Sequence, residues 1–386
     1  MTPRELIDSP DESAFRRGRE PISRVNWAGH DAWLLTRFDD VRAALSDRRL
    51  VPHIPGVTAG PGSIFLMSGS PHTRLRGLLT HALSARRARA GYAITRRLCR
   101  TRVADLIAAG PPMDLLADYA APVAVGALGQ LLGVSIVERD GFAAWSSQLN
   151  AVFSTDDPEQ MARAGGELAG FVASLVAEKL ACPSSDLISA LCAARDADGV
   201  GLTESELVGL VFSVLGAGYL PPARAAVLGL LRLLLDPPAA DTLRQHPTRL
   251  ATAVEELLRL DPGGYLNVDR VLRAVESLRM RGITIHAGDY VIAPLGAANR
   301  DPDRFPDPDT LRLDRTPNPH LAFAPGAHHC LGAPLARMQL SAMIGTVLTA
   351  LPSLKLATGL DNLTWHMGFG GAKNLAALPV DWQPDL

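Results

Sequence analysis

In Phe323-Ala-Pro-Gly-Ala-His-His-Cys-Leu-Gly332, one cysteine stands on a glycine-flanked loop directly before an apolar run. That run, 331–351, has a helical pattern, so the sulfur of Cys330 would lie at the positive, N-terminal end of a helix. Unpaired backbone N–H groups at such an end favour the anionic thiolate, which is the form that binds metals. Gly326 and Gly332 would let the backbone approach whatever the sulfur binds. The pattern predicts that Cys330 is a metal ligand.

The same stretch resembles a known family signature. Phe323, Gly326, His328, Cys330 and Gly332 match F-x-x-G-x-H-x-C-x-G, the signature of the cytochrome P450 family. Further segments resemble the family in order along the chain: 33–47, 72–76, 186–191, 256–259, 299–305 and 320–337. The resemblance implies a haem-thiolate oxidoreductase in which Cys330 is the axial ligand of the iron of haem b, with the other four residues in haem contact.

The resemblance also implies the fold. We expect a mainly α protein with small β-sheets (α+β), in which the haem lies between a long distal helix and the helix that follows the cysteine loop. Short strand-like runs fall within 25–36, 278–291 and 375–382, with turn residues at 28–29 and 287–289. Elsewhere helical periodicity dominates.

Composition agrees with one large soluble domain. The 386 residues are 47% hydrophobic, and no low-complexity linker or repeat divides them, so we expect a single domain over 1–386. A net charge of −2 gives no general attraction to nucleic acid or to an anionic membrane. Four cysteines without a C-x-x-C pair indicate a reducing compartment, and residues 1–20 contain no signal core or membrane anchor. We therefore expect a cytoplasmic monomer.

The clearest helix begins at Thr203-Glu204-Ser205-Glu206, a capping box, and continues to Leu235 over roughly 50 Å. The run 207–223 carries no charge, which would also suit a membrane span. The prolines beside it, together with Arg224 and Arg232, argue against a helix that faces lipid. We interpret it as the central buried helix, which in the resembled family passes over the distal face of the haem.

That helix carries the main departure from the family pattern. The family motif A-G-x-[D/E]-T provides an acid and an alcohol that organise water for proton delivery, whereas this chain has Ala217-Gly218-Tyr219-Leu220-Pro221-Pro222. Leu220 and Pro221 thus replace the relay side chains. Prolines cannot donate to the carbonyls of Ala217 and Gly218, so we expect a kink over the haem. Either water on the freed carbonyls or the substrate supplies the proton, or the reaction inserts no oxygen. Ala217, Gly218, Leu220 and Pro221 are the candidate catalytic positions.

Further residues are predicted to hold the haem. His72 and Arg76 are four residues apart, so a helix places both on one face, suited to a haem propionate. The resemblance gives His328 the same role. Another propionate contact could come from Arg270 or Arg273, and both alternatives stay open.

Other family positions concern the structure. Glu256 and Arg259 match E-x-x-R, and the resemblance implies that an arginine of a later meander joins them to brace the cysteine side. Ala324 stands where the family usually has glycine, and Gln339 where glutamate is common. We expect Ala324 to be tolerated if its φ is negative.

Substrate contacts can be named only by resemblance. The candidates are mostly apolar: Phe65, Leu66, Met67, Tyr219, Asn267 and Phe369. The basic segment 86–102 is either a solvated helix face or the docking site of an acidic ferredoxin, which with its reductase would supply electrons. Its arginines are not interleaved with aromatic residues beyond Tyr92, so nucleic acid is not the expected partner.

Three functions remain open on this sequence. The first is an enzyme of bacterial secondary metabolism that activates O2 to hydroxylate a natural-product scaffold or to couple aromatic groups, for example in a short peptide. The second is a peroxide-driven oxygenase; some such family members carry proline at the relay position, but beside an arginine where this chain has Leu220. The third is a non-catalytic helper, against which the retained Cys330, His72, Arg76 and His328 argue.

Overall fold

The computed structural model describes residues 20–27, 29–58, 60–83, 85–134, 158–262, 270–368 and 372–383. The helices are α3 (Phe38–Ser46), α4 (Gly69–Ala82), α5 (Ala85–Ala109), α6 (Ala121–Leu132), α8 (Pro158–Ala181), α9 (Leu187–Ala193), α10 (Glu204–Leu234), α11 (Pro237–Gln245), α12 (Leu250–Leu260), α13 (Leu295–Ala298) and α14 (Ala333–Ala350). Short helical turns are η1 (Leu115–Ala120), η2 (Pro247–Arg249), η3 (Gly326–His328) and η4 (Leu360–Asn362).

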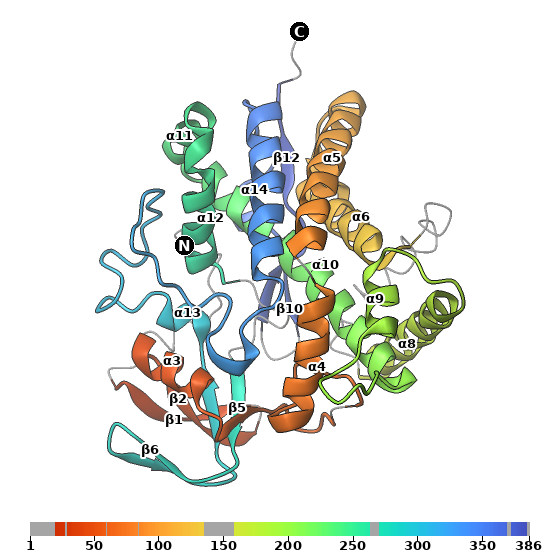
Figure 1. Ribbon diagram of the computed structural model, residues 1–386. Helices are drawn as coiled ribbons and strands as arrows, with labels where there is room; N and C mark the ends of the chain where they lie inside the picture. The colour runs from red at the N-terminus through yellow and green to blue at the C-terminus, as the bar shows by residue number, and fades with distance from the viewer. Residues whose placement is uncertain are drawn as a thin grey trace.

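The strands are short. They are β1 (Ile22–Trp27), β2 (His30–Leu35), β3 (Leu50–Pro52), β4 (Met113–Asp114), β5 (Arg270–Ala274), β6 (Leu278–Met280), β7 (Ile283–Ile285), β8 (Tyr290–Ala293), β9 (Lys355–Leu356), β10 (Trp365–Gly368), β11 (Ala372–Leu375) and β12 (Pro379–Asp381). The largest sheet has the order β1-β2-β8-β5-β3, with β2 and β8 parallel and the other pairs antiparallel. This sheet and the β6-β7 hairpin lie at one end of the molecule, at the bottom of Figure 1, where α3 and α4 lie beside them.

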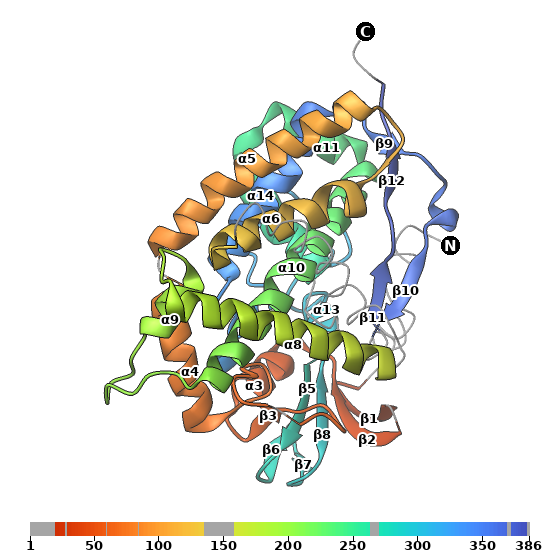
Figure 2. The ribbon, with the colours of Figure 1, turned by 90° about the vertical axis from the view of Figure 1, so that its right-hand side faces the viewer.

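α10 forms the centre of the helical part, where α6, α8 and α14 pack against it (Figures 1 and 2). Its start confirms the predicted capping box, because Thr203 accepts from the N–H of Glu206 and the Glu206 side chain accepts from the N–H of Thr203. The helix continues through Pro221 and Pro222 to Leu234. The prolines therefore do not end the helix, and the expected kink stays a prediction.

The predicted fold class is confirmed: the described residues form mainly helices with small sheets. By length and composition, α10 and the segment Leu115–Leu132 are apolar enough to cross a membrane, but 67% of the α10 segment is buried inside the protein. Such burial is typical of a core helix. α14 begins at Ala333, slightly later than the apolar run, because Gly332 caps the helix and Pro334 occupies its first turn.

Candidate active site

The cysteine loop is closed by its own backbone. The N–H of Cys330 donates to the carbonyl of Phe323 at 2.9 Å, and the N–H of Ala333 donates to the carbonyl of Cys330 at 3.3 Å. The first bond holds the two sides of the loop together, and the second joins the loop to the first turn of α14. Cys330 therefore lies at the N-terminal end of α14, where the helix dipole favours a thiolate.

Two residues of this loop have left-handed backbone conformations. Gly326 has φ +79°, and a Cβ there would lie 2.5 Å from the carbonyl oxygen of Leu45, so only glycine fits. Ala324 has φ +48°, so the condition for tolerating alanine, a negative φ, is not met. An L-residue in this region is strained by roughly 1–2 kcal/mol, because its Cβ crowds the following carbonyl. The backbone at position 324 therefore has a conformation that glycine adopts easily, although the residue there is alanine.

α4 supplies a wall beside the cysteine. The imidazole rings of His72 and His328 are 4.2 Å apart, and Nη2 of Arg76 donates to the carbonyl of His329 at 2.5 Å. Burial lowers the pKa of Arg76, and the negative charge of the Cys330 thiolate opposes this change. Burial, followed by the charge of Arg76, also lowers the pKa of His72. The structure therefore brings the four predicted residues of α4 and the loop together.

α4 is also fixed to the start of α10. Arg74, between the two candidate haem residues, donates to Glu206 at 2.8 Å, to Asp196 at 2.7 Å and to the carbonyl of Gly201 at 2.6 Å. One oxygen of Glu206 thus receives Arg74 while the other receives the Thr203 N–H of the capping box. The helix that carries His72 is held against the first turn of the central helix.

Of the two arginine alternatives on β5, the structure describes the side chain of Arg273. The side chain of Arg273 is exposed and lowers the pKa of His53, after the larger effect of burial on that imidazole. Arg273 therefore lies beside His53 on an exposed face of the sheet, which does not suit a buried haem contact. The side chain of Arg270 itself is outside the described part of the chain.

One face of α10, called the open stripe below, is only partly buried. Ala217, Gly218 and Pro221 are only partly buried, whereas Tyr219 is 1% and Leu220 is 4% exposed and both belong to the main apolar core. The helical period explains this difference, because positions 217 and 221 share one face and 219 does not. Gly218 packs against α6, since a Cβ there would lie 2.9 Å from Cδ1 of Leu128. The structure thus leaves Ala217 and Pro221 on the partly buried face, whereas Leu220 and the candidate substrate contact Tyr219 lie in the apolar core.

The candidate substrate segment 65–67 is positioned by a glycine pair. Gly62 packs directly on Gly209 of α10, and a Cβ on Gly62 would lie 2.8 Å from the Gly209 Cα. Ser213 donates to the carbonyl of Gly62 at 3.3 Å and fixes the segment further. Phe65, Leu66 and Met67 follow as partly buried side chains. Asn267 and Phe369, the other candidates, lie outside the described residues.

Sequence reasoning missed a second support of the cysteine loop. Glu255 accepts from Arg337 at 2.8 and 2.9 Å and from His320 at 3.1 Å, so one carboxylate joins the residues that flank the loop on both sides. Arg337 also lies 4.4 Å from the ring centroid of Phe323. Burial raises the pKa of Glu255, but these hydrogen bonds outweigh burial and lower it to about 2. The only signal in the sequence was that His320 and Arg337 are the first and last residues of the matched segment 320–337.

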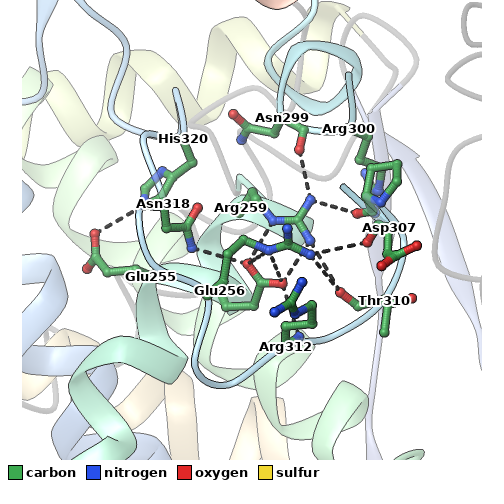
Figure 3. Close-up of polar contacts among 12 residues, drawn as sticks. Glu255, Glu256, Arg259, Asn299, Arg300, Asp307, Thr310, Arg312, Asn318 and His320 are labelled. Carbon is green, nitrogen blue, oxygen red and sulfur yellow. Dashed lines mark hydrogen bonds and ion pairs between the residues drawn. The ribbon is translucent and has the colours of Figure 1, made fainter. Parts of the chain in front are cut away.

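The E-x-x-R pair forms a fully buried network with the arginine that the resemblance implied, which is Arg315. Glu256 accepts from Arg259 at 2.7 and 2.8 Å and from Arg315 at 3.0 Å at each oxygen. Figure 3 shows Asn318 also directed at Glu256, to which it donates at 3.1 Å, and Arg259 reaching the carbonyl of Asn299 at 2.8 Å. The guanidinium groups thereby tie α12 to the segment before the cysteine loop, which assigns this pair to structure.

These residues fit a haem. A Cβ added at Gly332 would meet only the Cys330 sulfur, at 3.9 Å, so the space beside the sulfur is open to a flat group. The thiolate is a ligand that suits iron, and the guanidinium of Arg76 with the imidazole N–H groups of His72 and His328 suits carboxylates at the edge of such a group.

Comparison with known proteins agrees with this geometry. The family model described as Cytochrome P450 matches residues 147–354. The mycinamicin IV hydroxylase/epoxidase of Micromonospora griseorubida is 37% identical over 94% of this chain and 93% of that protein. The nocardicin C N-oxygenase of Nocardia uniformis subsp. tsuyamanensis is 34% identical over 95% of this chain and 94% of that protein. The crystal structure of CYP105P1 with filipin I superposes with a TM-score of 0.90 at 31% identity and covers 99% of this chain and 98% of that one.

Proposed function

Because the chain belongs to the cytochrome P450 family, we propose that it is a haem-thiolate oxygenase of bacterial secondary metabolism, with Cys330 as the axial ligand of haem b. The observation that carries this proposal is the position of Cys330 at the start of α14, within the electrostatic reach of Arg76. When bound, the haem iron supplies the activation of O2 for transfer to a substrate.

The protein residues have distinct roles in this proposal. The helix end and the Phe323 carbonyl keep the Cys330 loop in position, while His72, Arg76 and His328 hold the propionates. Arg270 is the preferred fourth propionate contact, since Arg273 is exposed. Gly326 allows the tight loop turn, and Gly332 leaves room beside the sulfur.

The reaction we propose is hydroxylation or epoxidation of a natural-product scaffold. The relatives support this class, since one is named a hydroxylase/epoxidase and another an N-oxygenase. Oxidative coupling of aromatic groups is the second candidate, and it is favoured by the absence of the acid and alcohol at Leu220 and Pro221. In either case the carbonyls of Ala217 and Gly218, which Pro221 and Pro222 cannot bond, are acceptors for water on the open stripe.

The proposal also includes an electron donor and a location in the cell. Arg96, Arg97 and Arg100 of α5 are exposed and suit an acidic ferredoxin that delivers electrons from its reductase. The burial of α10 supports a cytoplasmic protein, and we propose that the whole chain forms one monomeric domain.

A ligand substitution tests the proposal. In Cys330→Ser, the reduced carbon-monoxide complex should lose its thiolate-type absorption, while Cys182→Ser, at an exposed cysteine just beyond α8, should keep it. An unchanged spectrum in Cys330→Ser would overturn the ligand assignment, and a purified protein that takes up no haem would overturn the function.

A second experiment addresses the distal helix. The double variant Leu220→Glu with Pro221→Thr restores the family's acid and alcohol. It should change the ratio of product formed to O2 consumed. An unchanged ratio would show that this position takes no part in proton delivery, and incorporation of labelled oxygen into the product separates oxygenation from coupling.

A further inference from the structure

His329, the residue directly before Cys330, forms a side-chain hydrogen bond across the cysteine loop. Its Nδ1 lies 2.7 Å from the carbonyl oxygen of Ala324. A carbonyl oxygen only accepts, so this ring nitrogen carries a proton and donates it. The backbone N–H of His329 donates to the carbonyl of Gly326 at 3.1 Å, and its own carbonyl accepts from Arg76 at 2.5 Å. One residue thus joins the two sides of the loop to each other and to α4.

The acceptor of this bond is the strained residue of the loop. Ala324 has φ +48°, which residues with a Cβ rarely adopt. It also precedes Pro325, whose ring pushes the residue before it toward an extended conformation. Both effects favour relaxation of Ala324 to a negative φ. The left-handed conformation therefore persists only because contacts in the folded loop hold it.

Hydrogen bonds hold both peptide groups that flank Ala324. In the group before it, the Phe323 carbonyl accepts from the N–H of Cys330 at 2.9 Å. In the group after it, Pro325 has no N–H, so the Ala324 carbonyl is the polar atom by which this group can be held. The imidazole of His329 provides that bond. Since φ and ψ describe how these two rigid groups are turned about Ala324, holding both of them fixes its conformation.

We propose that His329 is a positioning residue, which keeps the Cys330 thiolate in place for iron by holding Ala324 in its left-handed conformation. This inference rests on the proposed function and adds a residue to the same site. Without the imidazole, Ala324 is free to relax, and the peptide group that contains the Phe323 carbonyl turns with it. That carbonyl is the acceptor of the Cys330 N–H. The residue that carries the sulfur then loses a fixed position.

The experiment follows the reduced carbon-monoxide complex of the holoprotein and measures the rate at which its thiolate-type absorption is lost. The bond of His329 is neutral and partly buried, so His329→Ala should lose this absorption roughly fivefold faster than the wild type, the range of one ordinary hydrogen bond. His329→Asn should keep a rate close to that of the wild type, because the amide nitrogen of asparagine can donate from about the place of Nδ1. His286→Ala, at an exposed histidine between β7 and β8, is the matched control and should leave the rate unchanged.

A second comparison tests whether the bond acts through Ala324. Glycine adopts a positive φ without strain, so it does not need the imidazole to hold it. In the Ala324→Gly background, His329→Ala should therefore change the rate far less than it does in the wild-type background. A general weakening of the structure would have the same effect in both backgrounds.

The outcomes separate this inference from the proposed function. A wild type without haem or without thiolate-type absorption overturns the proposed function, and this inference with it. If the wild type has that absorption, an unchanged rate in His329→Ala overturns this inference alone. An asparagine variant as fast as the alanine variant does the same, as does an equal effect of His329→Ala in both backgrounds. Should His329→Ala take up no haem, adding Ala324→Gly must restore uptake, and failure to do so also overturns the inference.

Discussion

The carboxylate of Glu255 receives two hydrogen bonds from Arg337, at 2.8 and 2.9 Å, and so joins α12 to the helix that begins after the cysteine loop. The same carboxylate accepts from His320, on the other side of that loop. The cysteine loop is therefore held at both ends by one acidic residue that takes no part in the family signature.

Glu255 gives a prediction about pH. Because its pKa falls from 4.5 to about 2 on folding, its contribution to stability is complete above about pH 4.5 and is lost as the pH falls toward 2. Glu255→Gln should lower the free energy of unfolding at pH 7 on the order of 2 kcal/mol, and the difference from wild type should vanish near pH 2. Denaturant unfolding at several pH values measures this, with Glu178→Gln, a 47% exposed side chain, as control. A difference that does not depend on pH would contradict the assignment.

Ala324 predicts a stabilising substitution. At φ +48° alanine is strained, so Ala324→Gly should raise the free energy of unfolding by about 0.5–1 kcal/mol after the greater entropy of glycine in the unfolded chain is subtracted. Ala336→Gly, in the helical part of α14, should instead lower it by about 1 kcal/mol. Urea denaturation of both variants checks the pair. If both variants lowered the free energy of unfolding by the same amount, the backbone at residue 324 would be unstrained.

The network around Glu256 predicts a large loss. Arg315→Met removes two hydrogen bonds from a fully buried carboxylate and two more from the carbonyls of Pro306 and Asp307, which should cost about 3 kcal/mol or more. Arg312→Met is the matched control, because that side chain is 44% exposed and only its backbone N–H reaches Glu256. Thermal unfolding of the holoproteins measures both, and similar melting temperatures would refute a bracing role for Arg315.

The glycine pair predicts an effect on substrate binding. A methyl group at Gly209 would overlap with the carbonyl of Pro61, so Gly209→Ala must displace the segment before Phe65 and should destabilise the protein by about 1–3 kcal/mol. Spectral dissociation constants for substrates should rise in parallel. Gly170→Ala, in α8 with open space at the Cβ position, should be neutral or stabilising by up to about 1 kcal/mol. If both variants bind substrate like the wild type, the segment does not line the site.

The sequence predicted features that depend on local rules. The capping box of Thr203 and Glu206 and the position of Cys330 just before a helix follow from residues a few positions apart, and the structure contains both. The clamp of Glu255 did not follow, because its partners are 65 and 82 residues away along the chain. The left-handed backbone of Ala324 was also hidden, since only the folded loop imposes it.

The distal helix shows a different limit of sequence reasoning. Leu220 was a candidate because it replaces the acid of the family motif, and Tyr219 because the resemblance puts this segment beside the substrate. The packing of α10 decides which positions face the open stripe, and it puts both of these side chains in the core.

The shared carboxylate of Glu206 makes two elements of the site thermodynamically dependent on each other. One oxygen stabilises the first turn of α10 and the other receives Arg74 of α4, so fraying of that turn also weakens the hold on the helix that carries His72. The dependence is reciprocal: whatever orders α4 must, by the same free energy, protect the first turn of α10 from opening. Binding of the haem beside α4 should therefore slow amide hydrogen exchange in the first turn of α10.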